Sequence, residues 1–132
     1  MFEELEHTAD LAIRVSSANL TGLFAEASKA VIALSGIEPL SSPIDESIIN
    51  LHAADLESLL VKWLEELIYE IEVNHRTYHD FQIVVDGEYN LEANVMLVPI
   101  ASISRLIKAV TFHELAIQQV DNRLETVIVF DV

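Results

Sequence analysis

The chain has 132 residues, a hydrophobic fraction of 52% and no cysteine. This size fits one domain, residues 1–132, with a well-filled core, and the lack of cysteine excludes disulfides, thiolate metal ligands and a cysteine nucleophile. Twenty-two acidic residues against seven basic ones give a formal net charge of −15. Because such a molecule repels phosphate backbones, we expect no direct nucleic-acid binding, and we expect attraction to cations or to basic protein surfaces.

No apolar run reaches the length of about 18 residues that a membrane span requires. The first ten residues also lack the basic and apolar segments of a signal peptide. We therefore expect a cytoplasmic protein that has no membrane partner.

The first predicted strand follows directly after a polar stretch. The residues EHTAD (6–10) precede the apolar run LAIRV (11–15). Either these polar groups only cap and turn the chain, or the strand holds them at a binding site.

Two helices are predicted in the first half of the chain. Asn19 is a typical N-cap before an apolar helical pattern over residues 20–34, and Gly36 suits the carboxyl-terminal cap. Asp55 precedes a broader apolar stripe over residues 56–71, on which Trp63 is expected to be a core residue. The alternation of residues 47–53 predicts a strand between the two helices.

The second half of the chain is predicted to contain mainly strands. The polar segment at residues 74–80 is interpreted as a loop, so its histidines, His75 and His79, are not expected to bind a metal. Alternation predicts strands over residues 81–85 and 91–97, with Pro99 ending the second. Residues 104–120 are predicted to be a long β-type stretch, and Asp121 with Asn122 indicates a hairpin turn before the last strand.

This order of elements predicts the fold class. A strand, a helix, a strand, a helix and then consecutive strands indicate an α+β domain in which two helices pack against a mostly antiparallel β-sheet.

Carboxylates near both ends of the chain form a candidate cation site. Asp131 ends an apolar strand, and the terminal carboxylate of Val132 follows it. If the first and last strands are neighbours, Asp10 converges with them and gives an oxygen site that suits Ca²⁺ or Mg²⁺. The alternative is that Asp10 caps a turn and Asp131 ends its strand in water.

A second polar cluster lies in the segment KAVTFH, residues 108–113. Lys108 is one of only seven basic residues, and Thr111 and His113 are expected to share a strand face opposite Lys108. The alternative is an ordinary surface lysine together with a structural histidine. No glycine-rich phosphate loop, serine elbow or HExxH motif is present in the sequence.

Three stretches and one helix resemble the archease family. They are EHTADLAIRV (6–15), IKAVTFHEL (107–115), the terminal FDV (130–132) and DLESLLVKWLEELIYE (55–70). The resemblance covers nearly the whole chain. It implies a non-catalytic protein cofactor of the RtcB-type RNA ligase, which joins RNA ends in tRNA splicing and RNA repair with GTP and Mn²⁺ through a guanylylated histidine. Such a cofactor promotes ligase guanylylation and sustains multiple turnovers.

The resemblance also assigns candidate residues. It implies a divalent cation, Ca²⁺ first and Mg²⁺ or Mn²⁺ as alternatives, bound by Asp10, Asp131 and Val132. Lys108 and His113 are implied to belong to the functional surface that meets the ligase. His7 and Thr8 are expected on the same surface, as groups that support the ligands or form the turn.

Two departures from the family pattern concern the backbone. Glu114 stands where the family commonly has glycine, and Leu11 and Ala12 stand where it commonly has Val-Gly. Two other functions stay open on the sequence alone: a metal-dependent hydrolase that uses Asp10 and Asp131 directly, and a chaperone-like binding module with a structural ion.

Overall fold

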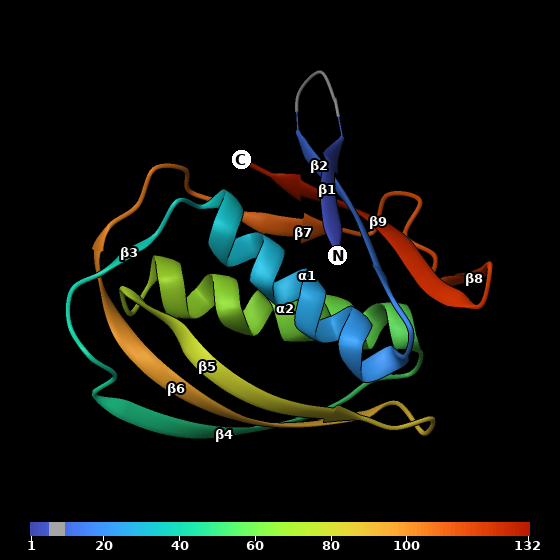
Figure 1. Ribbon diagram of the computed structural model, residues 1–132, viewed down its shortest axis with the longest axis horizontal. Coiled ribbons are helices and arrows are strands. Elements are labelled where there is room, and N and C mark those ends of the chain that lie inside the picture. The colour runs from blue at the N-terminus through green and yellow to red at the C-terminus, as the bar shows by residue number, and fades with distance from the viewer. Residues whose placement is uncertain (6–9) are drawn as a thin grey trace.

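The computed structural model describes residues 1–5 and 10–132, which form two antiparallel sheets with two helices between them (Figure 1). The helices are α1 (Leu20–Leu34) and α2 (Leu56–Glu72). The five-stranded sheet contains β1 (Phe2–Leu5), β2 (Leu11–Ser17), β7 (Ala109–Thr111), β8 (Gln118–Val120) and β9 (Arg123–Asp131). The four-stranded sheet contains β3 (Glu38–Pro39), β4 (Asp45–His52), β5 (Arg76–Val85) and β6 (Asn90–Ser102). The predicted α+β class is confirmed.

Both helices begin where the sequence predicts, and α1 ends as predicted, whereas α2 ends at Glu72, one residue beyond the predicted stripe. The side chain of Asn19 accepts a hydrogen bond from Gly22 N at 2.7 Å, and the side chain of Asp55 accepts one from Ser58 N at 2.7 Å. These side chains satisfy N–H groups that the first helical turn leaves unpaired. Gly36 follows α1 with a φ of +61°, a backbone conformation that favours glycine at the end of a helix.

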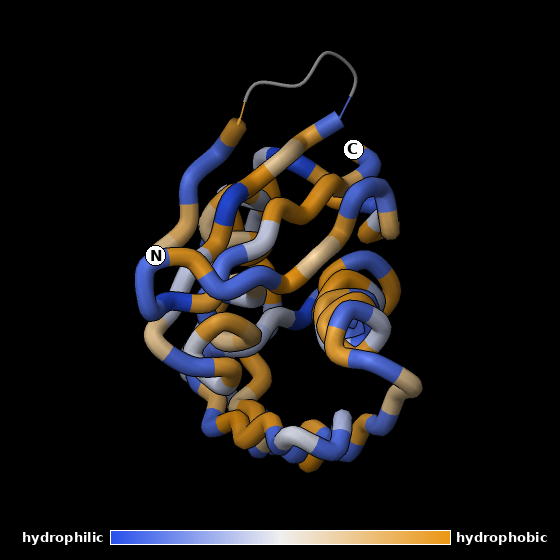
Figure 2. Tube along the Cα trace, turned by 90° about the vertical axis from the view of Figure 1, so that its right-hand side faces the viewer, coloured by the Kyte–Doolittle hydropathy of each residue, from blue (hydrophilic) through white to orange (hydrophobic). Residues whose placement is uncertain are grey.

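The core lies between the helices and the two sheets. Trp63 of α2 is fully buried, as expected, and its indole N–H donates to Phe24 O of α1 at 3.1 Å. Its ring packs against Tyr78 and Phe81 of β5 at centroid distances of 5.4 and 5.9 Å. Buried and exposed residues alternate along β6, which turns one side of the four-stranded sheet toward these helices, and hydrophobic and hydrophilic segments follow one another along the trace in Figure 2.

Three sequence-based expectations about the strands are wrong. Residues 76–80 are not a loop but the start of β5, and a β-bulge between Tyr78 and Asp80 interrupts the alternation there. Pro99 does not end β6, because it lies beside the short, irregular pairing with β3, where a residue without an N–H group is tolerated. Residues 104–120 contain only the three-residue strands β7 and β8, joined by turns.

The hairpin at residues 121–122 is confirmed. Asp121 and Asn122 have φ values of 49° and 65°, as the tight connection between β8 and β9 requires. No helix in the described part of the chain is both long enough and apolar enough to cross a membrane.

β4 and β5 flank the central strand β6 of the four-stranded sheet and form its long edges. On β4 the N–H of Glu46 donates to the carboxylate of Asp45 at 2.8 Å. On β5 the N–H of Phe81 donates to the carboxylate of Asp80 at 2.8 Å. Each edge therefore satisfies one backbone donor with the aspartate that precedes it, and the Asp45 carboxylate also forms an ion pair with Arg76 at 3.1 Å.

Candidate functional site

The candidate site lies at the end of the five-stranded sheet where β2 begins and β9 ends (Figure 1). Leu11, the first residue of β2, pairs with Phe130 of β9. Asp10 and Asp131 are the residues immediately beyond this pair, so the strand register brings the two predicted ligands to one end of the sheet. Asp10 is half-buried, and Asp131 and Val132 are exposed.

Lys108 lies beside the end of β9, on the side of β9 opposite to β2. Its backbone N–H donates to Asp131 O at 2.8 Å, and Ala109 pairs with Asp131 as β7 begins. The Lys108 side chain is exposed, whereas its neighbour Ile107 is buried. Among the residues that the structure describes, Lys108 forms no ion pair. Within the described residues, its charge is therefore not used to hold the fold together.

The sequence predicts that His113 shares a strand face with Thr111, and this prediction is wrong. β7 ends at Thr111, and His113 lies in the following turn, where its N–H donates to Thr111 Oγ1 at 3.3 Å. The next residue, Glu114, has a φ of 53°. This left-handed conformation is the one that glycine adopts without steric cost, which explains physically why glycine suits this position.

Other expected residues fall in different surroundings. His7 and Thr8 lie outside the described residues. Leu11 and Ala12 are buried in β2 and pair with Phe130 and Val129, so strand pairing accommodates both residues where the family commonly has Val-Gly.

The donor set of the candidate site is carboxylate oxygen, which suits Ca²⁺, Mg²⁺ or Mn²⁺. It contains two aspartate side chains and the end of the chain at Val132. No group of three or more His, Cys, Asp or Glu side chains within residues 1–5 and 10–132 is arranged to hold a metal ion. A metal here therefore needs the terminal carboxylate or water as further ligands.

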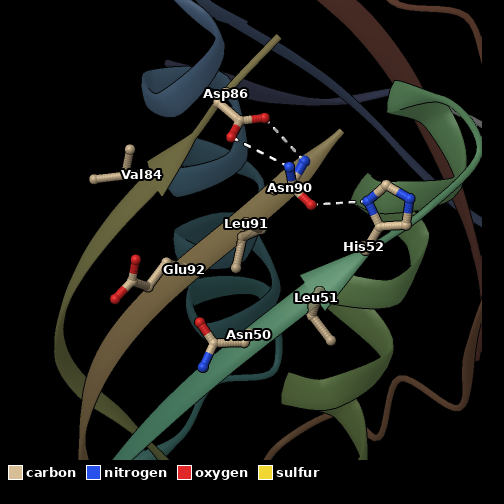
Figure 3. A pocket seen from close by; sticks show the side chains of 8 residues that line it. All are labelled: Asn50, Leu51, His52, Val84, Asp86, Asn90, Leu91 and Glu92. Carbon is tan, nitrogen blue, oxygen red and sulfur yellow. Dashed lines mark hydrogen bonds between the residues drawn. The ribbon is translucent and has the colours of Figure 1, made fainter. Parts of the chain in front are cut away.

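A further polar cluster, which was not predicted from the sequence, lies at the end of the four-stranded sheet where β4 ends and β6 begins (Figure 3). His52 Nδ1 lies 2.8 Å from Asn90 Oδ1, and the Asn90 side chain donates to Asp86 at 3.3 Å. Backbone N–H groups of Asn90 and Glu88 also donate to Asp86 and hold the pKa of its carboxyl below the usual range. These residues line a shallow hollow of about 400 Å³. Asp86 and Asn90 meet locally across the turn between β5 and β6, whereas His52 reaches Asn90 only through the pairing of β4 with β6.

The fold and the candidate site define a class of small, acidic α+β proteins in which two helices separate two antiparallel sheets and carboxylates gather where the first long strand meets the last. The family model described as "Archease protein family (MTH1598/TM1083)" matches residues 2–132. The chain belongs to the archease family.

Individual relatives agree with this assignment. Proteins named archease from Saccharolobus islandicus and Methanosarcina mazei are 31% and 30% identical and are covered over 98% and 95% of their lengths, with 99% of this chain aligned in each case. A crystal structure from Thermotoga maritima, described as "an archease, possible chaperone", has a TM-score of 0.74 at 25% identity and covers 98% of this chain and 96% of that one. The solution structure of Methanobacterium thermoautotrophicum protein 1598 shares the fold with a TM-score of 0.74 at 23% identity, covering 99% and 98% of the two chains.

Proposed function

We propose that the protein is a non-catalytic activator of an RtcB-type RNA ligase. In this role it promotes the GTP-dependent guanylylation of the ligase and its multiple turnover in tRNA splicing or RNA repair. Membership of the archease family supports the proposal. The observation that carries it is the meeting of the ends of β2 and β9 with Lys108 at one end of a sheet. The net charge of −15 supports docking on a basic partner.

A divalent cation belongs to this proposal. Asp10, Asp131 and the carboxylate of Val132 would hold it, with Ca²⁺ as the first candidate and Mg²⁺ or Mn²⁺ as alternatives. When bound, the cation neutralises carboxylates that otherwise repel one another at this end of the sheet.

Lys108 is proposed to contact a phosphate or an acidic group in the partner's active site. Its exposure and its freedom from ion pairs within the described residues support a role outside the fold. His113, in the exposed turn after β7, would lie on the same surface, together with His7 and Thr8.

The proposal is tested by incubating the protein with GTP, Mn²⁺ and a broken RNA, with and without a purified RtcB-type ligase at substoichiometric amounts. An activator raises the number of RNA joints formed per ligase and does nothing alone. Hydrolysis of GTP or RNA by the protein alone would instead support a metal-dependent hydrolase that uses Asp10 and Asp131. An unchanged ligase turnover number would reject the activator.

A chaperone-like binding module with a structural ion is the second candidate. It is favoured by the description of the Thermotoga maritima relative as a possible chaperone. This candidate predicts that the protein suppresses the aggregation of an unrelated unfolded protein, measured by light scattering, and leaves ligase turnover unchanged.

A further inference from the structure

The four-stranded sheet has one face that no described element covers. Both helices pack against its other face, as Figure 1 shows. Along β6 the buried residues that meet the helices alternate with the exposed residues Asn90, Glu92, Asn94 and Met96. We call the exposed positions of residues 46–52, 80–86 and 90–96 the open face.

Several polar residues of the open face are poor strand formers. Asn90, Glu92 and Asn94 occupy three consecutive outward positions of β6, the central strand, and Gln82 of β5 lies directly opposite Asn94. Asparagine is depleted in strands, and glutamate to a lesser degree, whereas Thr and Val fit the pleated surface better. Where residues that disfavour β-strands occupy a strand without a gain in packing, they are expected to serve a function.

The open face is also charged with a single sign. It carries the carboxylates of Glu46, Asp80, Asp86 and Glu92, and no lysine or arginine occurs within 46–52, 80–86 or 90–96. Glu46 and Asp80 both lie opposite Met96, one on each side of it. These three residues line a hollow of about 270 Å³ together with the amides of Gln82 and Asn94. Carboxylate and amide oxygens around a methionine match the charged head and the aliphatic stem of an arginine.

Apolar side chains lie among these polar groups. Ile48 of β4 is 64% exposed and Val84 of β5 is 65% exposed. They stand on opposite sides of β6, with Ile48 opposite Asn94 and Val84 opposite Glu92. The open face thus combines isolated aliphatic contacts with hydrogen-bond acceptors, as polar protein interfaces do.

We propose that the open face binds an arginine-bearing segment of a partner protein. Arginine supplies the donors that carboxylates and amides accept, and leucine-like side chains between the arginines cover Ile48 and Val84. A second copy of this chain does not fit, because its own four carboxylates would meet the same four carboxylates.

This proposal does not depend on the ligase. The open face belongs to the four-stranded sheet, whereas Asp131 lies in the five-stranded sheet on the other side of the helices and Lys108 directly precedes its strand β7 (Figure 1). A failure of ligase activation therefore leaves the open-face proposal standing, and the converse also holds.

The side-chain amides provide the test. The ¹⁵N-labelled protein is titrated with the blocked peptide acetyl-Arg-Leu-Arg-Leu-Arg-amide, with the Gln-Leu version of the peptide as the control. We expect saturable shifts of the NH₂ signals of Asn50, Gln82 and Asn94, and smaller shifts of Gln118 and Gln119, which are exposed on β8 of the other sheet. Shifts of equal size on β8, or no shift with peptide in the millimolar range, would overturn the proposal.

A matched pair of variants removes the same charge in two places. Glu92→Gln takes a carboxylate from the middle of the open face, and Glu65→Gln takes one from the exposed side of α2. We expect Glu92→Gln to raise the peptide Kd about threefold or more and Glu65→Gln to change it less than twofold. Equal effects would show that the net charge of the whole molecule attracts the peptide and would also overturn the proposal.

Discussion

Lys108 is the residue whose proposed role in function is most cleanly separated from any role in folding. Its backbone is bonded to Asp131, but its side chain is exposed and forms no ion pair within the described residues. We expect Lys108→Ala to change the free energy of unfolding by less than about 0.5 kcal/mol, as surface substitutions usually do. Ligase activation should fall sharply, and Lys108→Glu should lower it further. Activation is measured as RNA joints formed per ligase, and stability by urea unfolding.

The control for this prediction is Lys29→Ala, which removes an exposed lysine from α1. Lys108→Arg separates charge from shape, because arginine restores the charge but not a compact point contact. If Lys108→Ala activates a ligase as well as the wild type does across a salt series, the lysine has no role in activation.

Tyr78 makes the stability of the protein sensitive to alkali. Its hydroxyl is buried and has no hydrogen-bond partner among the described residues. Burial raises the pKa of the Tyr78 hydroxyl well above its usual range, and the nearby carboxylates of Glu66 and Glu70 raise it further. The neutral form is therefore favoured in the folded state. Its contribution to stability is complete below the unfolded-state pKa of about 10 and is lost progressively as the pH rises above that value.

Tyr78→Phe should remove this alkaline loss. Because the substitution deletes an unsatisfied hydroxyl, we expect the free energy of unfolding at pH 7 to stay level or to rise by up to about 1 kcal/mol. Above pH 10 the variant should lose stability less steeply than the wild type in urea unfolding. A variant that is strongly destabilised at pH 7 would show that the hydroxyl makes a stabilising contact.

At the scale of elements, the connection between β7 and β8 carries local backbone strain. Glu114 is held at a φ of 53° in a turn, where a side chain other than glycine costs about 1 kcal/mol. We expect Glu114→Gly to leave the free energy of unfolding level or to raise it by up to about 1 kcal/mol, since the gain offsets the added freedom of the unfolded chain. Glu114→Ala removes the charge but keeps the strain, and it should give no such gain. Thermal unfolding of both variants checks this, and an equal gain from Ala would assign the effect to charge.

Elements with strong local signals could be predicted from the sequence, and elements that depend on distant partners could not. Asn19 and Asp55 cap helices because side chain and backbone meet within three residues. The start of β5 cannot be predicted from the sequence, because the bulge near Tyr78 interrupts the alternation and only the pairing with β6 defines the strand. The separation of the strands into two sheets is likewise a matter of long-range pairing.

The candidate site follows the same division. The sequence identifies Asp131 and Lys108 as charged residues in apolar surroundings, and Asp10 as the last residue of a polar stretch before an apolar strand. Their common position depends on the pairing of both β2 and β7 with β9. β2 and β9 are more than a hundred residues apart in the sequence. In the cluster of His52, Asp86 and Asn90, the contact between Asp86 and Asn90 is local to one turn, whereas the contact between His52 and Asn90 depends on the pairing of β4 with β6.

For the whole molecule, the proposed cation predicts selective stabilisation by calcium. A ligand that binds only the folded state at a hundredfold excess over its Kd adds about 2.7 kcal/mol. We expect millimolar Ca²⁺ to raise the melting temperature of the chelator-treated protein by more than NaCl of equal ionic strength does. Asp131→Asn should fold without the cation, because it relieves repulsion between carboxylates, and should lose most of the calcium effect.

Glu65→Gln is the matched control, since it removes one carboxylate from the surface of α2 and should keep the calcium effect. A chelator-treated wild type that melts at the same temperature with and without millimolar Ca²⁺ would count against the cation site.

The exposed edges of β4 and β5 make fibril formation depend on the net charge of the molecule. At pH 4.4, the isoelectric point of the sequence, the net charge is zero and the long-range repulsion between copies of the chain disappears. The protection of these edges is then only local, through the bonds from the N–H groups of Glu46 and Phe81 to the side chains of Asp45 and Asp80. We expect slow acidification to convert the folded protein into fibrils with a 4.7–4.8 Å cross-β reflection, whereas the same protein at pH 7 stays dispersed.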